Sequence, residues 1–248
     1  MQYKIYPVFL GDVITDKGDS LRGTPHGVPL KTVYSCFALR DENGKAMLVD
    51  SGLPSQEDIV KNHKPYRRMP GAPDFVTALA NTGVDPDEIE TVVLTHLHYE
   101  HSCNLRFLKN LKEVYVQQKE LLYAIAPKKE DLYYYSLRED CGGPEWTDAL
   151  GKFKILDGDS QICEGVHVLL TPGHSPGSQS VVVDTAEGVF ILTGDFISIL
   201  ESFTTRTPNA ILNNEKDWFD SYEKIAAIPD AIILPSHEKR IFDRRVYG

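Results

Sequence analysis

The segment at residues 95–101 constrains this chain more than any other part of it. It reads Thr-His-Leu-His-Tyr-Glu-His and directly follows the apolar run 91–94. The run is short, rich in β-branched residues and bounded by polar sequence, which predicts a buried strand that ends at the first histidine. The chain must therefore present three imidazoles and one carboxylate at the end of a strand.

The residue types in segment 95–101 indicate a metal site. Imidazole nitrogens suit zinc, iron and similar ions, and a carboxylate adds negative charge. Four such groups this close together cannot all bind one tetrahedral ion without strain, so the spacing favours two adjacent ions. A surface loop that happens to be rich in histidine is the alternative interpretation.

Other strand-to-turn junctions carry the same kinds of side chain. A predicted strand at 166–170 runs into a turn in which proline and glycine flank His174 on both sides. Such residues force a defined turn, which aims the imidazole off the end of the strand. Asp195 and His237 also follow apolar predicted strands. These segments, far apart in sequence, are therefore candidates for the same site.

Residues 33–39 and 45–49 predict a hairpin, because Asn43-Gly44 is a strong turn signal between them. The second strand runs into Asp50. A carboxylate at a strand end can accept the free N–H of a ligand imidazole and fix its orientation. A plain strand terminator is the alternative role for Asp50.

The pattern His96-x-His98-x-Glu100-His101 resembles the His-x-His-x-Asp-His signature of the metallo-β-lactamase superfamily, with Glu100 where the family has aspartate. The order of the later motifs matches as well. Within the superfamily the chain most resembles the N-acyl-homoserine lactonases, over nearly its whole length. The resemblance implies one domain over residues 1–248, an α/β fold of the αββα sandwich type, with two mixed sheets face to face and helices outside.

The resemblance also implies a ligand set and a reaction. One divalent ion is held by His96, His98 and His174, the second by Glu100, His101 and His237, and Asp195 lies between them. Zinc is the favoured metal, with iron or manganese as alternatives. In this family a hydroxide that bridges the two metals attacks a lactone carbonyl, and Asp195 or Glu100 transfers its proton to the leaving oxygen.

Two departures from the family pattern keep other functions open. Glu100 is one methylene longer than aspartate, and Ser198 stands where the lactonases have a tyrosine that contacts the substrate. A small-molecule thioesterase or another ester hydrolase on the same two-metal site is one alternative to a lactonase. A metal-binding protein that has lost its activity is the other.

The composition limits the partners. A net charge of -10 disfavours nucleic acid, because binding a phosphate backbone requires a basic surface. No apolar run reaches the length of a membrane span, and no secretory signal is visible at the N-terminus. Four scattered cysteines fit a reducing compartment, so we expect a cytoplasmic enzyme, monomeric or homodimeric, that binds a small lactone or ester and no membrane.

Several further segments have predicted conformations. The loop 16–29, rich in glycine and proline, either lines the substrate pocket or is a solvated connection. Asn104 is expected to begin a helix as its N-cap. The run Tyr133-Tyr134-Tyr135 either walls a pocket or belongs to the core or a subunit interface. The predicted helices are 73–81, 118–126, 129–138 and 217–227.

Overall fold

The computed structural model describes residues 1–55, 57, 59, 61 and 71–248. A six-stranded sheet takes its strands in sequence order, and the second, five-stranded sheet has the order β11-β10-β9-β8-β7. The strands of the first sheet are β1 (Tyr3–Asp16), β2 (Pro29–Asp41), β3 (Ala46–Val49), β4 (Thr91–Val93), β5 (Glu113–Gln117) and β6 (Phe153–Leu156). Those of the second are β7 (Ser160–Cys163), β8 (Val166–Leu170), β9 (Gln179–Thr185), β10 (Gly188–Leu192) and β11 (Ile232–Leu234).

Both sheets are mixed. β1, β2 and β3 pair antiparallel, whereas β3 to β6 pair parallel. In the second sheet only β10 and β11 are parallel. The predicted hairpin β2–β3 is confirmed, and β9 and β10 form a second antiparallel hairpin.

The helices lie outside the two sheets. They are α1 (Lys17–Ser20), α3 (Phe75–Ala80), α4 (Tyr99–Ser102), α5 (Gln118–Ile125), α6 (Leu200–Thr204) and α7 (Glu215–Ala226). Short 3₁₀ segments lie at Pro86–Glu88, Leu105–Phe107, Lys129–Asp131, Glu145–Lys152 and Lys239–Asp243. The predicted helix 129–138 is wrong beyond its first turn, because residues 132–138 form turns and bends. In the described part of the chain, no helix is both long and apolar enough to cross a membrane.

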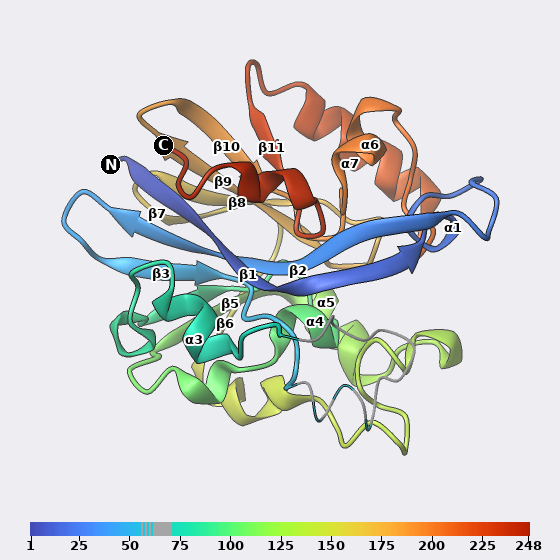
Figure 1. Ribbon diagram of the computed structural model, residues 1–248, viewed down its shortest axis with the longest axis horizontal. Coiled ribbons are helices and arrows are strands. Elements are labelled where there is room, and N and C mark those ends of the chain that lie inside the picture. The colour runs from blue at the N-terminus through green and yellow to red at the C-terminus, as the bar shows by residue number, and fades with distance from the viewer. Residues whose placement is uncertain (56, 58, 60, 62–70) are drawn as a thin grey trace.

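The layers confirm the expected αββα sandwich. The sheets face each other across an apolar core that includes Phe37 and Val93 of the first sheet and Leu192 of the second. Helices α3, α4 and α5 lie against the outer face of the first sheet, and α6 and α7 cover the second (Figure 1). Strand β4 illustrates this layering, because Val92 packs into the core on the helix side of the sheet and Val93 packs into the central core between the sheets. A strand buried on both faces reads as a continuous apolar run.

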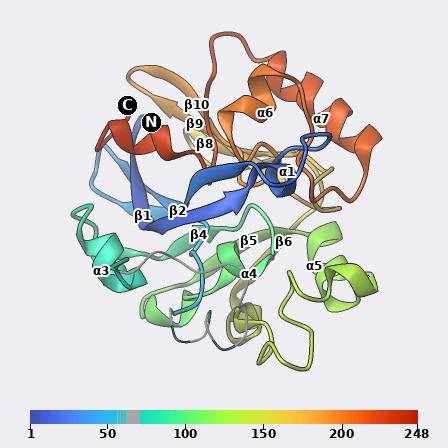
Figure 2. The same ribbon diagram turned by 45° about the vertical axis from the view of Figure 1, so that its right-hand side comes forward.

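The strands also determine where functional side chains gather. β3 and β4 are parallel neighbours in the first sheet, and β10 and β11 are parallel neighbours in the second. The carboxyl ends of parallel neighbours lie at the same edge of a sheet. The long β1–β2 pair continues past this edge, as far as Asp16 opposite Pro29. Figure 2 shows this far end of the pair, with α1, beside the second sheet and its helices.

Candidate metal centre

Every side chain that the sequence marks as a metal ligand lies just beyond a strand end. The loop after β4 carries His96 and His98, the short helix α4 that follows carries Glu100 and His101, and the turn after β8 carries His174. Asp195 follows β10 and His237 follows β11. The structure brings both sheets' contributions together, as the sequence predicted.

Two groups of side chains are close enough to share a cation. Nitrogen atoms of His96, His98 and His174 lie within 4.8 Å of one another, and we call these residues the three-histidine group. Ligand atoms of His96, His101 and Asp195 lie within the same distance of one another. Among the described residues, neither group of three includes Glu100 or His237. His237 is nevertheless adjacent, since its Nε2 lies 3.0 Å from Oδ1 of Asp195.

The outward ring nitrogens are held by fixed partners. Nδ1 of His101 lies 2.8 Å from Oδ2 of Asp50, and Nδ1 of His96 lies 3.1 Å from the Thr95 hydroxyl. Nδ1 of His174 donates to a backbone carbonyl at 3.0 Å, and Nδ1 of His237 donates to another at 2.7 Å. Each Nε2 therefore faces the site. Ligand histidines in metalloproteins are oriented in this way by outer partners.

His98 has the opposite orientation. Its Nδ1 lies 3.2 Å from Nε2 of His174, and its ring stacks on Tyr134 with centroids 5.1 Å apart. The three-histidine group thus takes Nδ1 from one histidine and Nε2 from the other two. The sequence alone does not show which ring nitrogen of each histidine faces the site.

Asp50 occupies the supporting position that the sequence predicted. Its Oδ2 accepts from the Thr95 hydroxyl as well as facing His101, and its Oδ1 accepts from the Thr95 backbone N–H at 2.7 Å. The residue has φ of 63°, a left-handed conformation that aspartate tolerates better than most side chains. This backbone turn aims the carboxylate under the histidine loop.

Burial keeps the three-histidine group neutral. It lowers the pKa of His96 and His98 well below the usual value, and that of His174 also falls. A histidine must be deprotonated to bind a metal ion. The pKa directions therefore fit a cation site at these three side chains.

The Asp195 side of the site is charged instead. Burial opposes ionisation of Asp195, but His237 and His101 outweigh burial and hold its pKa well below the usual value. Burial likewise opposes protonation of His101 and His237, and the Asp195 carboxylate overcomes it and raises the pKa of both. A cation that binds here must displace those protons, so binding should release protons to solvent.

Glu100 differs from the other six residues. Burial raises its pKa to about 7, and its Oε2 is buried without a hydrogen-bond partner among the described residues. Nε2 of His96 is buried and unpartnered in the same sense, whereas Nε2 of His101 lies 3.2 Å from Oδ1 of Asp195. Buried polar atoms almost always have partners, so two such atoms in segment 95–101 need an explanation. A bound divalent cation fits the donor set, which is imidazole and carboxylate.

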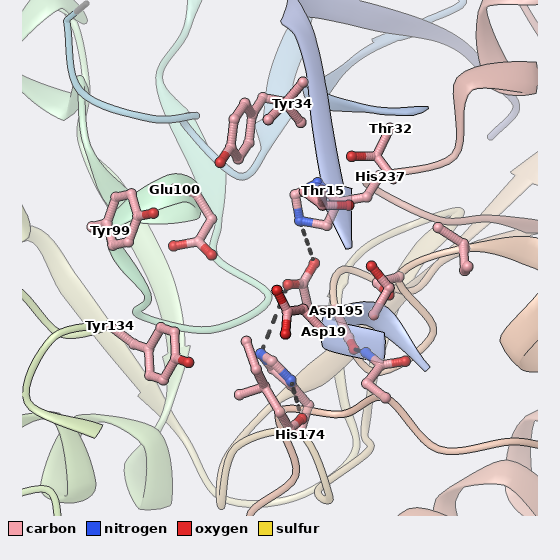
Figure 3. Close-up of a pocket in the computed structure, with 16 residues that line it drawn as sticks. Thr15, Asp19, Thr32, Tyr34, Tyr99, Glu100, Tyr134, His174, Asp195 and His237 are labelled. Atoms are coloured by element: carbon pink, nitrogen blue, oxygen red, sulfur yellow. Dashed lines mark hydrogen bonds and ion pairs between the residues drawn. The ribbon is translucent and has the colours of Figure 1, made fainter. Parts of the chain in front are cut away.

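A pocket opens in front of these residues. Its polar and charged lining includes Thr15, Thr32, Ser198, Asn209 and Asp19. In Figure 3, Glu100 and Tyr134 stand across the pocket from Asp195, and the Tyr134 hydroxyl points toward its middle. Segment 16–29, expected to be a loop, contains the short helix α1, and Asp19 and Ser20 of that helix line the pocket, one of the two expected roles. The tyrosine run divides, since Tyr134 faces the pocket and Tyr135 belongs to the core.

One buried carboxylate at the site was not predicted. Glu120 lies in the first turn of α5. It accepts hydrogen bonds from the two segments that carry the three-histidine group, 95–101 and 174–177. A glutamate in the predicted helix 118–126 gives no sequence signal for such a role. Only the closeness of the three segments reveals it.

Comparisons with known proteins agree with this geometry. A family model described as the metallo-beta-lactamase superfamily matches residues 31–237. An N-acyl homoserine lactonase of Bacillus cereus is 28% identical over 223 residues, which are 86% of this chain and 83% of that protein. The lactonase AiiA of Bacillus thuringiensis subsp. kurstaki is 28% identical over 218 residues, which are 84% of this chain and 81% of that protein.

Solved structures show the same fold. A structure described as an N-acyl homoserine lactone hydrolase with the product N-hexanoyl-L-homoserine at its catalytic metal centre is 24% identical, with a TM-score of 0.80. The alignment covers 98% of this chain and 96% of that one. AidC, described as a dizinc quorum-quenching lactonase, is 14% identical with a TM-score of 0.72, covering 96% and 88%.

Proposed function

Because the chain belongs to the metallo-β-lactamase superfamily, we propose that it is a metal-dependent hydrolase that opens lactones of the N-acyl homoserine type. One observation carries the proposal: ligand side chains from both sheets converge at a pocket, and two of their buried atoms, Nε2 of His96 and Oε2 of Glu100, have no hydrogen-bond partner among the described residues. The lactonase relatives supply the substrate class.

We also propose that residues 1–248 form a single domain, since both sheets contribute to one central core.

We propose two cation positions at this site. The three-histidine group would hold one cation, and His101, His237 and Glu100 the other, with Asp195 between them. Zinc suits this mixture of imidazole and carboxylate, with iron or manganese as alternatives. Divalent cations bound here supply Lewis-acid polarisation of a carbonyl oxygen and lower the pKa of water.

The side chains of the pocket would bind and orient the lactone. The Tyr134 hydroxyl points into the pocket, and Ser198 is one of the residues that line it. Both can donate to an ester or amide oxygen. This supports a substrate with a carbonyl group close to the ligand residues. The Ser198 side chain is too short to replace the tyrosine of the lactonases by itself. We therefore assign the contact with the substrate oxygen to the longer side chain of Tyr134.

Glu100 is our candidate for proton transfer. Glu100 lines the pocket, and a carboxylate there can take a proton from the attacking water and give it to the leaving oxygen. Opening a lactone requires a proton to move from the attacking water to the leaving alkoxide oxygen. Asp195 is the other candidate for this step; it also lines the pocket, and its Oδ1 accepts from Ser236 Oγ at 2.7 Å.

The described cysteines support the expected compartment. Cys36, Cys103, Cys141 and Cys163 are all free thiols. Free thiols persist in a reducing environment. We therefore propose a cytoplasmic enzyme.

The experiment is a substrate panel with metal analysis. Protein loaded with zinc, manganese or iron is assayed by proton release against N-acyl homoserine lactones, unsubstituted lactones, a thioester and an aryl ester. The proposal predicts about two cations per chain by elemental analysis and the highest kcat/KM for a lactone. Two cations with no hydrolysis would favour a binding protein, and preference for the thioester would replace the lactone by the other candidate class.

A further inference from the structure

Glu120 is buried between the two segments that carry the three-histidine group. Its side chain is fully enclosed, with no exposed surface. The segments press closely on it, because a Cβ atom added to Gly177 would lie 2.1 Å from the Glu120 nitrogen. The carboxylate thus lies at the contact between α5 and the turn after His174.

The carboxylate accepts four hydrogen bonds. Oε1 accepts from the Leu97 backbone N–H at 3.0 Å and from the Tyr135 hydroxyl at 2.9 Å. Oε2 accepts from the Ser175 hydroxyl at 2.6 Å and from the Gly177 backbone N–H at 3.1 Å. Each carboxylate oxygen is therefore saturated by one backbone donor and one hydroxyl donor.

Three of the four donor residues lie next to a member of the three-histidine group. Leu97 lies between His96 and His98 in the chain, and Ser175 directly follows His174. The Tyr135 ring stands edge-on to His98, with centroids 4.8 Å apart. Each of the three imidazoles is therefore one step from the Glu120 carboxylate. Leu97 connects it to His96 and His98, Ser175 connects it to His174, and the Tyr135 ring gives His98 a second connection.

The chemistry of the four donors requires a carboxylate. A hydroxyl group can rotate and become an acceptor, but a backbone N–H cannot. Glutamine has the same shape, yet its NH₂ group would face the N–H of either Leu97 or Gly177 in both amide orientations. Glu120→Gln must therefore lose at least one bond to a ligand-bearing segment. A buried donor left without a partner is costly in the folded state.

We propose that Glu120 is a positioning residue that holds the three-histidine group in the geometry for binding a cation. This inference rests on the proposed metal site. Asp50 has the corresponding place on the other side, because it contacts His101 and Thr95. The two buried carboxylates therefore support different ligands. Glu120 holds the segments that carry the three-histidine group, and Asp50 orients His101.

The test compares zinc affinities of three variants. Metal-free protein is titrated with zinc in competition with a chromophoric chelator, and imidazole ¹⁵N shifts identify which histidines bind. Glu120→Gln should weaken zinc binding at His98 and His174 about 10–100-fold, the usual effect of losing an outer partner. Asp50→Asn should instead weaken binding at His101. Glu113→Gln is the matched control, because Glu113 also accepts from a tyrosine hydroxyl but lies on β5 away from the ligands.

A second measurement needs no metal. Amide hydrogen exchange at Leu97 and Gly177 should be faster in metal-free Glu120→Gln than in the wild type. If Glu120→Gln does not fold, Ser175→Ala and Tyr135→Phe each remove one bond and should each weaken zinc binding several-fold at the same histidines.

Unchanged zinc affinity in folded Glu120→Gln, or in both single-bond variants, would overturn the inference. Equal weakening at His101 and at the three-histidine group would also overturn it. A wild-type protein that binds no zinc, manganese or iron would instead refute the proposed function, and the exchange rates would still decide whether Glu120 holds the two segments.

Discussion

Replacing Gly177 by alanine tests whether the turn that carries His174 must lie directly against helix α5. The added Cβ would stand 2.1 Å from the Glu120 nitrogen and 2.6 Å from its Cα. Both atoms belong to the backbone, so no side chain can rotate away. The turn and the helix have to move apart.

The size of the movement follows from these distances. An ordinary carbon contact needs about 3.4 Å or more, so the two segments must separate by about 1.3 Å. Overpacking of this kind costs about 1–3 kcal/mol of folding free energy. His174 lies three residues before Gly177, and a ligand displaced by about 1 Å can lower kcat/KM about 100-fold. We therefore expect a folded but destabilised protein with a much larger loss of activity than of stability.

The assay pairs urea unfolding with lactone turnover on metal-loaded protein. Gly151→Ala is the matched control, since a Cβ there would meet nothing within 4 Å. That variant should keep full turnover and stay within about 1 kcal/mol of the wild type. Wild-type stability and turnover in Gly177→Ala would refute the reasoning, because they would mean that the close approach is not needed.

Three further predictions concern the ligands and a helix cap. His98→Ala should abolish turnover and lower the metal content by about one ion per chain, with an unchanged circular dichroism spectrum; full metal content would contradict its assigned role. Glu100→Asp should change the turnover rate or the preference among zinc, manganese and iron, and unchanged values would show that the length of this carboxylate is unimportant. Thr77 lowers the pKa of Asp74 through backbone and side-chain hydrogen bonds to it. This stabilisation is therefore complete above the usual carboxyl pKa and is lost as the pH falls through the lowered value. Asp74→Ala should cost about 1 kcal/mol at pH 7 in urea melts and progressively less in acid; a constant difference would exclude the charged cap.

Local sequence patterns were sufficient to locate most of the strands and the ligand turns. The run before His96 had to be a strand because both of its faces are buried, and the flanking prolines and glycines marked the turn at His174. The role of Asp50 followed from its place at a strand end. Each of these features is encoded in a short stretch of sequence around the residue concerned.

The features that were missed depend on contacts between distant segments. Residues 132–138 leave the helix because Tyr99 N–H donates to the Tyr134 carbonyl, and Ser136 adopts φ of 55°. Asn104 does stand at the N-cap of the 3₁₀ segment Leu105–Phe107, but its side chain donates to the carbonyls of Ser51 and Leu53 and does not cap that segment. Neither partner could be identified from the local pattern.

The division of the ligands between the sheets makes the cation site a cross-link. His96, His98 and His101 extend from the first sheet, whereas His174, Asp195 and His237 extend from the second. A cation held between them ties the two layers of the sandwich together only in the native state, so mass action links cation concentration to resistance against unfolding. At a free concentration of 100 times Kd the gain is about 2.7 kcal/mol. The melting temperature should therefore rise with the logarithm of free zinc, which makes a thermal melt a titration of the metal centre.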